Sequence, residues 1–200
     1  MPTSSQEPQP AEEIALPAAV VVAGAEMHII DETGEVVEAF PYSSDPKTVV
    51  DSLTGVFASP PTITEHPGDG HCYSDATVAS WSDDGFTMLF DTPFIIEAQQ
   101  FQIHATVPEV NGVEITTPTG VSVGDPIDLL QEAIPVEQRQ EPVASGGVTY
   151  TFVDYDVAVG EWASPGSPEF GAGEYWGAQA VGLDGSVGEL NAAVVLVDQC

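Results

Sequence analysis

The chain has 200 residues, 42% of them hydrophobic, so it is long enough and apolar enough to bury a core. The chain has 32 acidic residues but only two basic ones, Lys47 and Arg139, which gives a formal net charge of −30 at pH 7. Nucleic acids and anionic membrane surfaces are bound through cations, so this charge excludes both as expected partners. No apolar stretch reaches the roughly 20 residues of a membrane-spanning helix, and we expect no membrane span.

The acidity has three interpretations. It can solvate a protein at high salt, as in halophiles, or keep an exported bacterial protein soluble by self-repulsion. It can also bind divalent cations or a basic partner. The acidic residues are scattered along the chain, which favours the first two interpretations. The apolar run at residues 15–25 has no basic flank and contains Pro17, so it is not a signal peptide. An extracellular or cell-surface location therefore assumes that the chain is a mature form.

The N-terminal half begins with a polar stretch, residues 1–17, whose four prolines predict a flexible tether. Two apolar runs, residues 18–30 and 36–40, flank a Gly-containing turn and predict a β-hairpin. A helix is expected from Asp45, which can cap it, to Leu53, and the Pro-rich residues 58–70 are expected to form a loop. Strands are predicted at residues 72–82, 86–90 and 94–107, with Asp84-Gly85 turning the first into the second because Gly tolerates positive φ.

The C-terminal half opens with Asn111-Gly112 and a strand at residues 113–117. A second helix is expected between Asp125 and Pro135, with Pro126 at its first position. The remaining segments are a polar linker, a strand, a long loop and a closing hairpin, predicted at residues 136–145, 148–157, 163–173 and 175–197.

The two Asp-Pro helices echo each other. Asp45, Pro46, Val49, Val50 and Leu53 recur at the spacings of Asp125, Pro126, Leu129, Leu130 and Ala133. Strands that follow one another without intervening helices argue against a parallel βαβ sheet. We therefore expect an α+β fold with antiparallel sheets and short helices packed on one side. It would consist of a tether (1–17), a first module (18–110) and a second module (111–200).

The segment Val123-Gly-Asp-Pro-Ile-Asp-Leu-Leu130 and its echo at Asp45 to Leu53 carry a resemblance. The tandem α+β modules resemble the β-lactamase inhibitor protein architecture and exported actinobacterial lipoproteins that pair such modules with a Pro-rich tether. The chain departs from the inhibitor pattern because it has no disulfide within each repeat. No inhibitory residue is therefore carried over to this sequence.

Cys72 and Cys200 are the two cysteines. In an exported protein an even number favours a disulfide, which would join the first module to the C-terminal end. Two unlinked structural thiols are the alternative. A reactive Cys72 activated by His71 is disfavoured, because adjacent residues on a strand point to opposite faces.

Catalytic and metal motifs are not evident. His66, His71 and Cys72 lie close in sequence but do not complete the four ligands of a zinc site. The acidic pairs do not match an EF-hand loop, although Asp154 and Asp156 would share one face of a strand, as a weak cation site or a solvated edge. No nucleophile elbow, Walker loop or dinucleotide fingerprint occurs. We predict no cofactor, no metal and no catalytic residue.

Aromatic residues gather around the predicted loop at 163–173 and are either a binding surface or a lid over the core: Trp162, Phe170, Tyr175 and Trp176. The leading hypothesis is an exported, non-enzymatic domain that uses this patch to bind a protein or an envelope component. The alternative is a secreted hydrolase or cation-dependent enzyme that uses Asp/Glu and His71.

Added salt should stabilise the fold, because it screens repulsion among the carboxylates. We expect the melting temperature to rise with NaCl and to level off below about 1 M, where the Debye length has fallen to about 3 Å. A rise that continues into the multi-molar range would instead support halophilic solvation. Thermal melts followed by circular dichroism measure both regimes.

Overall fold

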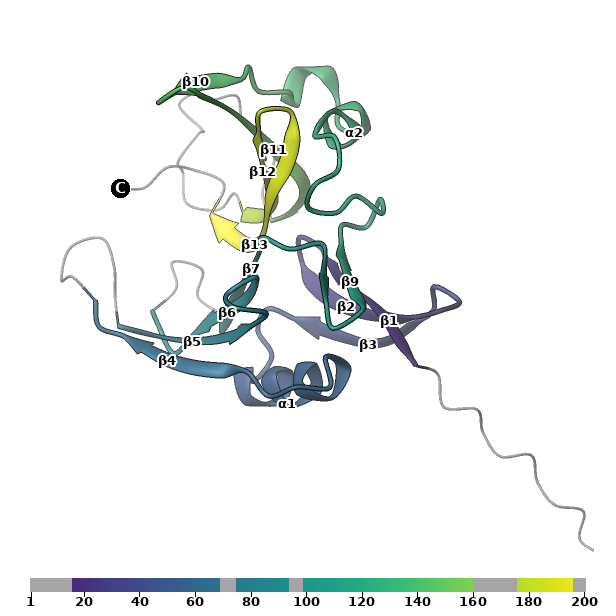
Figure 1. Ribbon diagram of the computed structural model, residues 1–200, viewed down its shortest axis with the longest axis vertical. Coiled ribbons are helices and arrows are strands. Elements are labelled where there is room, and N and C mark those ends of the chain that lie inside the picture. Colours follow the sequence, from purple (N-terminus) through teal and green to yellow (C-terminus); the bar gives the residue numbers. More distant parts are fainter. Residues whose placement is uncertain (1–15, 69–74, 94–98, 160–175, 196–200) are drawn as a thin grey trace, which may run out of the picture.

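The structure is a computed structural model that describes residues 16–68, 75–93, 99–159 and 176–195. Within these ranges most of the ordered chain lies in two β-sheets (Figure 1). The five-stranded sheet contains, in spatial order, β3 (Val36–Pro41), β2 (Glu26–Asp31), β1 (Pro17–Val22), β9 (Val113–Thr116) and β8 (Glu109–Val110). The eight-stranded sheet contains β10 (Val143–Ser145), β11 (Val148–Val159), β12 (Trp176–Leu183), β13 (Ser186–Val195), β7 (Phe101–Ala105), β6 (Phe86–Phe90), β5 (Ala76–Trp81) and β4 (Thr62–His66).

The predicted α+β class is wrong, because the fold is mostly β. Helical structure in the described ranges is confined to α1 (Pro46–Val56), the short α2 (Asp128–Ala133) and one 3-10 turn, η1 (Val136–Gln138). Segments expected to be loop or linker also form strands, β4 and β10. Not every pairing is antiparallel, since β1 runs parallel to β9 with Val20 opposite Ile115. Both sheets also combine strands from either side of residue 110.

The first Asp-Pro helix is confirmed. The Asp45 carboxylate accepts hydrogen bonds from the backbone N–H groups of Lys47 (2.8 Å) and Thr48 (3.4 Å), as an N-cap does. Val49 and Leu53 are fully buried on the inner face of α1. The helix also contacts β3, where the Ser52 hydroxyl donates to the Glu38 carboxylate.

The second Asp-Pro segment does not repeat this cap. The Asp125 carboxylate instead accepts the Ser122 N–H at 2.9 Å, and α2 begins only at Asp128. Pro126 forms an isolated β-bridge with Ser186, and the Ile127 N–H donates to the Gly185 carbonyl. The segment expected to form the first helical turn therefore pairs with the β12–β13 hairpin. Tertiary pairing thus overrides the local helix signal.

Edge-to-face aromatic packing forms the centre of the core under α1. The ring of Phe57, which follows the helix, lies 5.5 Å from Trp81 and 5.3 Å from Phe86. These rings are buried together with inward-facing residues of β6 and β7, among them Met88, Phe101 and Ile103. The prediction that Phe101 and Ile103 share one face is confirmed, since both are buried while Gln102 is not.

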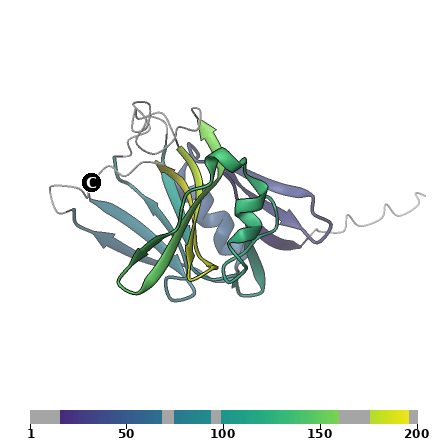
Figure 2. The same ribbon diagram turned by 90° about the horizontal axis from the view of Figure 1, so that it is seen from above.

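Two meanders make up the eight-stranded sheet. β4–β7 form one, β10–β13 the other, and they join where Ala105 and Ile103 of β7 pair with Leu190 and Ala192 of β13. In Figure 1, β11 and β12 run nearly upright whereas β4 and β5 run across the view, and the view from above in Figure 2 also separates them. The sheet therefore twists strongly, as antiparallel sheets do.

The predicted hairpin between β5 and β6 is confirmed, but for a different reason. Positive φ falls on Ser82 (52°), Asp83 (51°) and Asp84 (69°), whereas Gly85 does not adopt it. A Cβ at Gly85 would lie 2.5 Å from the Val107 side chain. Gly85 is therefore needed for close packing. The Asp184-Gly185 turn does have positive φ at both residues, as expected for its two-residue hairpin.

A β-bulge corrects the prediction that Asp154 and Asp156 share a face. Asp154 pairs with Gln179 and Asp156 with the next residue, Ala178, so Tyr155 is the extra residue. The buried Asp154 carboxylate accepts hydrogen bonds from Gln179 (2.8 Å) and Gln140 (3.3 Å), so it is not a solvated edge. Asp156 projects instead toward the turn between β1 and β2.

That turn is held by three side chains, which we name the turn clasp: Tyr42, Tyr155 and Asp156. The Tyr155 and Tyr42 hydroxyls donate to the Val22 and Ala23 carbonyls, each at 2.9 Å. The Asp156 carboxylate accepts the Gly24 N–H at 2.7 Å. Burial raises the pKa of both tyrosines, so their hydroxyls stay protonated donors. The clasp ties the five-stranded sheet to the eight-stranded sheet.

Removing one hydroxyl of the clasp should destabilise the whole fold. We expect Tyr42→Phe to lower the free energy of unfolding by about 1–3 kcal/mol, because the buried Ala23 carbonyl loses its partner. Tyr150→Phe, at a half-buried tyrosine of β11 outside the clasp, is the matched control and should stay within about 0.5 kcal/mol of the unmodified protein. Urea unfolding measures both, and equal effects of the two variants would contradict the clasp.

Candidate binding surface at the edge of the eight-stranded sheet

The predicted aromatic patch lies mainly outside the described residues. Trp162, Phe170 and Tyr175 belong to that part, so their grouping stays a prediction. Trp176 is described, at the start of β12, and its side chain is half-buried. Its ring meets that of Tyr42 edge-on at 6.5 Å, so this tryptophan packs against the core.

The predicted cysteine and histidine chemistry is equally untested, because His71, Cys72 and Cys200 lie outside the described residues. The described histidines lie apart on different strands. His28 contacts Glu26 at 2.8 Å on β2, while His104 of β7 lies 3.6 Å from Glu189 of β13 and lowers the pKa of that carboxyl. Among the described residues, no group of three His, Cys, Asp or Glu side chains could hold a metal ion. Nor does any described helix have the length and hydropathy to cross a membrane.

The free edge of the eight-stranded sheet at β4 is the most accessible candidate surface. All five of its residues are exposed, and 53% of the Ile63 side chain is open to solvent. In the ranges that the structure describes, β4 pairs on one side only, with β5. The sequence predicts a loop in place of this strand, because three prolines flank it: Pro60, Pro61 and Pro67. The available signal was the β-branched run Thr62-Ile63-Thr64 between them.

The other sheet edges carry features that limit strand pairing. β8 has two residues and β10 has three. β3 has six, but it ends in Pro41, its pairing with β2 is irregular at Ile29 and Ile30, and α1 contacts it through Ser52 and Glu38. Short length, proline and bulges are features by which proteins protect an edge. β4 has none of the three.

A hollow of ≈ 550 Å³ opens at the start of β4. It is lined by Ser59, Pro60, Thr62, Ser80, Trp81, Ser82, Asp83, Asp84 and Asn111. Hydrogen bonds fix its rim, since the Ser59 carbonyl accepts the Trp81 indole N–H at 3.0 Å and the Asn111 amide donates to the Ser59 hydroxyl at 3.0 Å. Two adjacent carboxylates, Asp83 and Asp84, make this first hollow acidic.

A second hollow of ≈ 440 Å³ lies at the other end of β4. It is lined by Glu65, His66, Pro67, Asp75, Ala76, Thr77 and Asp91. The Asp75 carboxylate accepts the Gly68 N–H at 2.8 Å, and Asp91 accepts the Thr77 hydroxyl at 3.2 Å. Among the described residues, three carboxylates and one histidine, His66, line the second hollow.

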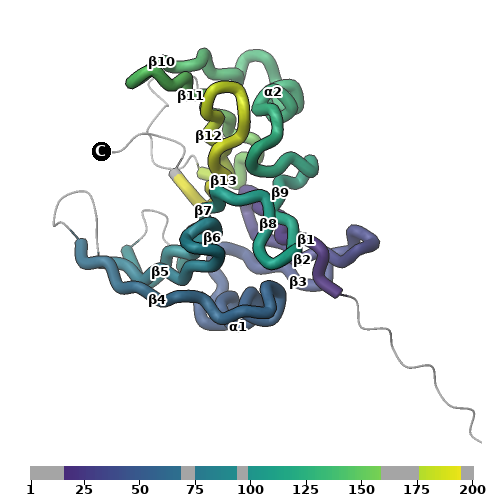
Figure 3. The backbone as a smooth tube through the Cα atoms, viewed as in Figure 1, coloured from purple at the N-terminus to yellow at the C-terminus, as the bar shows by residue number. Residues whose placement is uncertain are grey.

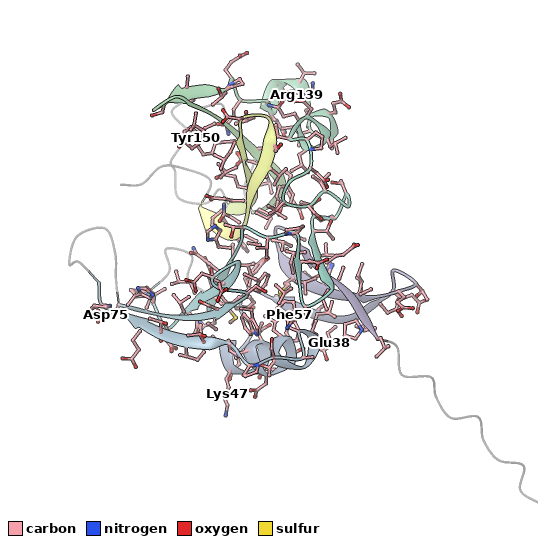
Figure 4. The ribbon with its side chains drawn as sticks, viewed as in Figure 1. Glu38, Lys47, Phe57, Asp75, Arg139 and Tyr150 are labelled. Atoms are coloured by element: carbon pink, nitrogen blue, oxygen red, sulfur yellow. The ribbon has the colours of Figure 1, made fainter. Side chains whose placement is uncertain are left out.

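Among the described residues, no lysine or arginine lines either hollow. Figure 4 shows Lys47 on α1 and Arg139 beyond α2, both far from Asp75, and neither lines a hollow. Arg139 donates instead to the Ile134 carbonyl at 3.3 Å, at the end of α2. The tube view in Figure 3 shows β4 at the lower boundary of the molecule, away from the β10–β13 half. The surface is therefore an exposed strand edge with an acidic hollow at each end.

Comparison with known proteins gives no relative for this chain. No family model, no curated protein and no solved structure matches it.

Proposed function

We propose that this chain is an exported, non-enzymatic domain that binds a protein partner by accepting an extended segment of that partner along β4. The observation that supports this most directly is the exposed edge of β4, from Thr62 to His66. An extended polypeptide adds to such an edge through main-chain hydrogen bonds, and its alternate side chains then occupy neighbouring pockets. An envelope component without a polypeptide backbone would not use the edge in this way.

Burial of Ile63 would add to the main-chain bonds. This side chain is exposed on the inward-facing side of β4, because its partner Ala79 on β5 is fully buried. A strand laid beside β4 would cover Ile63 with a side chain of its own and remove apolar surface from water. The edge therefore offers both unpaired backbone groups and an uncovered apolar contact.

Export is supported by composition: acidic self-repulsion and an even number of cysteines are typical of secreted bacterial proteins. Intact mass measured after alkylation of free thiols, with and without reductant, tests this part. We expect no alkylation of Cys72 or Cys200 until reductant is added, because the proposed disulfide would hold both sulfur atoms. Two thiols alkylated in the native protein would contradict export and favour an intracellular, halophilic protein.

Strand addition can be tested with a seven-residue peptide of alternating threonine and valine, in two forms that carry either glutamine or lysine at the second and sixth positions. We expect at least one form to slow hydrogen exchange at β4 amides that point away from β5. Exchange measured by NMR at every amide distinguishes β4 from the other edges. If neither peptide protects β4, the proposed function is wrong.

Two proline variants provide a matched control, because successive N–H groups of a strand point to opposite sides. One of Ile63→Pro and Thr64→Pro removes a donor at the free edge, and the other removes one that faces β5. The first should lose peptide binding while its melting temperature changes little, and the second should melt earlier. Equal peptide binding by both variants and the unmodified protein would contradict addition at β4.

A further inference from the structure

We infer that the segment accepted by β4 carries two cationic side chains four positions apart, one for each acidic hollow. This inference rests on the proposed strand addition and names the chemistry of the partner. Its basis is the placement of the two hollows, which include Thr62 at one end of β4 and Glu65 with His66 at the other.

The spacing follows from strand geometry. Thr62 and His66 are four residues apart, which corresponds to about 13 Å at roughly 3.3 Å per residue. Side chains of a strand return to the same face at every second position, so two cations on one face can be two or four positions apart. The spacing of four matches the separation of Thr62 and His66, the residues of β4 that line the first and the second hollow. Lysines at adjacent positions would point to opposite faces of the added strand.

The charge of the partner follows from the lining residues. Asp83 and Asp84 face the first hollow, while Glu65, Asp75 and Asp91 line the second. Lys47 and Arg139 line neither hollow, so a lysine or arginine side chain there must come from the partner. Exposed ion pairs contribute little individually, but the net charge of −30 adds a field that attracts cations from a distance.

A second copy of this chain is a poor occupant of the same edge. Two β4 strands side by side would bring the two Glu65 carboxylates and the flanking aspartates of both copies together, within molecules that each carry a net charge of −30. Like charges across paired strands are destabilising. The edge therefore discriminates against self-association and in favour of basic segments.

The test uses the full chain and four forms of the threonine–valine heptapeptide. The spaced-lysine form has lysine at the second and sixth positions, and the adjacent-lysine form has lysine at the second and third. The glutamine form and the glutamate form carry that residue at the second and sixth positions in place of lysine. At low salt the spaced-lysine form should bind about threefold to tenfold more tightly than the glutamine form, as two exposed ion pairs predict. The glutamate form should bind most weakly.

Variants assign each cation to its hollow. Asp83→Asn with Asp84→Asn neutralises the first hollow, and asparagine tolerates the positive φ of these residues. Glu65→Gln with Asp91→Asn removes two of the three carboxylates of the second. We compare the binding free energies of the spaced-lysine and glutamine peptides. Each pair of substitutions should reduce the difference between them by about half. Glu132→Gln with Glu137→Gln, on exposed residues of α2 and η1, changes the net charge equally and should leave that difference unchanged.

The outcomes separate this inference from the proposed function. Equal affinity of the spaced-lysine and glutamine forms, with β4 amides protected by both, would overturn the cationic partner and leave strand addition standing. Equal affinity of the spaced and adjacent lysine forms would overturn the assignment of one cation to each hollow. Absence of binding by all four peptides would overturn strand addition itself.

Discussion

The turn between β1 and β2 is the point on which the arrangement of the two sheets depends. This turn joins two neighbouring strands of the five-stranded sheet, and the main chain of Gly24 lies directly against the Asp156 carbonyl, with no room for a Cβ. The bulge in β11 allows two successive residues, Tyr155 and Asp156, to bond the last residue of β1, Val22, and Gly24 of the turn. Glycine again provides the room on the neighbouring strand, since a Cβ at Gly177 would collide with the same carbonyl. Polar side chains therefore hold together two sheets whose apolar faces share one core.

Joining two sheets at a turn, without closing either into a barrel, leaves four strand edges to manage. The chain limits three of them by short length or by proline, a bulge and a helix contact. Within the described residues, the fourth edge, β4, has no proline or bulge inside the strand and carries negative charge at both ends. Carboxylates on an edge prevent pairing with another acidic surface but do not prevent pairing with a basic one. The same residues can therefore keep copies of this protein apart and admit a different kind of strand.

Local signals in the sequence predicted elements well and their assembly poorly. The Asp45 cap, the β5–β6 hairpin and the shared face of Phe101 and Ile103 follow from short-range patterns, and the structure confirms them. The second helix is present as α2, but it begins at Asp128 and lacks the Asp-Pro start, because Ile127 pairs with Gly185, a partner that its neighbours in sequence do not reveal. The division between β1 and β2 was hidden within one continuous apolar run, where the turn residues are alanine and glycine instead of the usual polar ones. The candidate surface was missed for the opposite reason, since prolines that flank β4 made a genuine strand resemble a loop.

The parallel pairing of β1 with β9 also determines when the chain can fold. Val20 pairs with Ile115, and Ile103 pairs with Ala192, and in each pair the second residue is synthesised much later than the first. Neither sheet can therefore be complete until these distant segments have been synthesised. Topologies dominated by such pairings fold slowly, because loop-closure entropy is lost before the contacts form. On the ribosome, the β1–β3 meander would emerge with Val20 and Val22, both fully buried in the finished fold, still in contact with water. The dense negative charge of the chain, a formal −30 over 200 residues, opposes aggregation of neighbouring nascent chains during this interval.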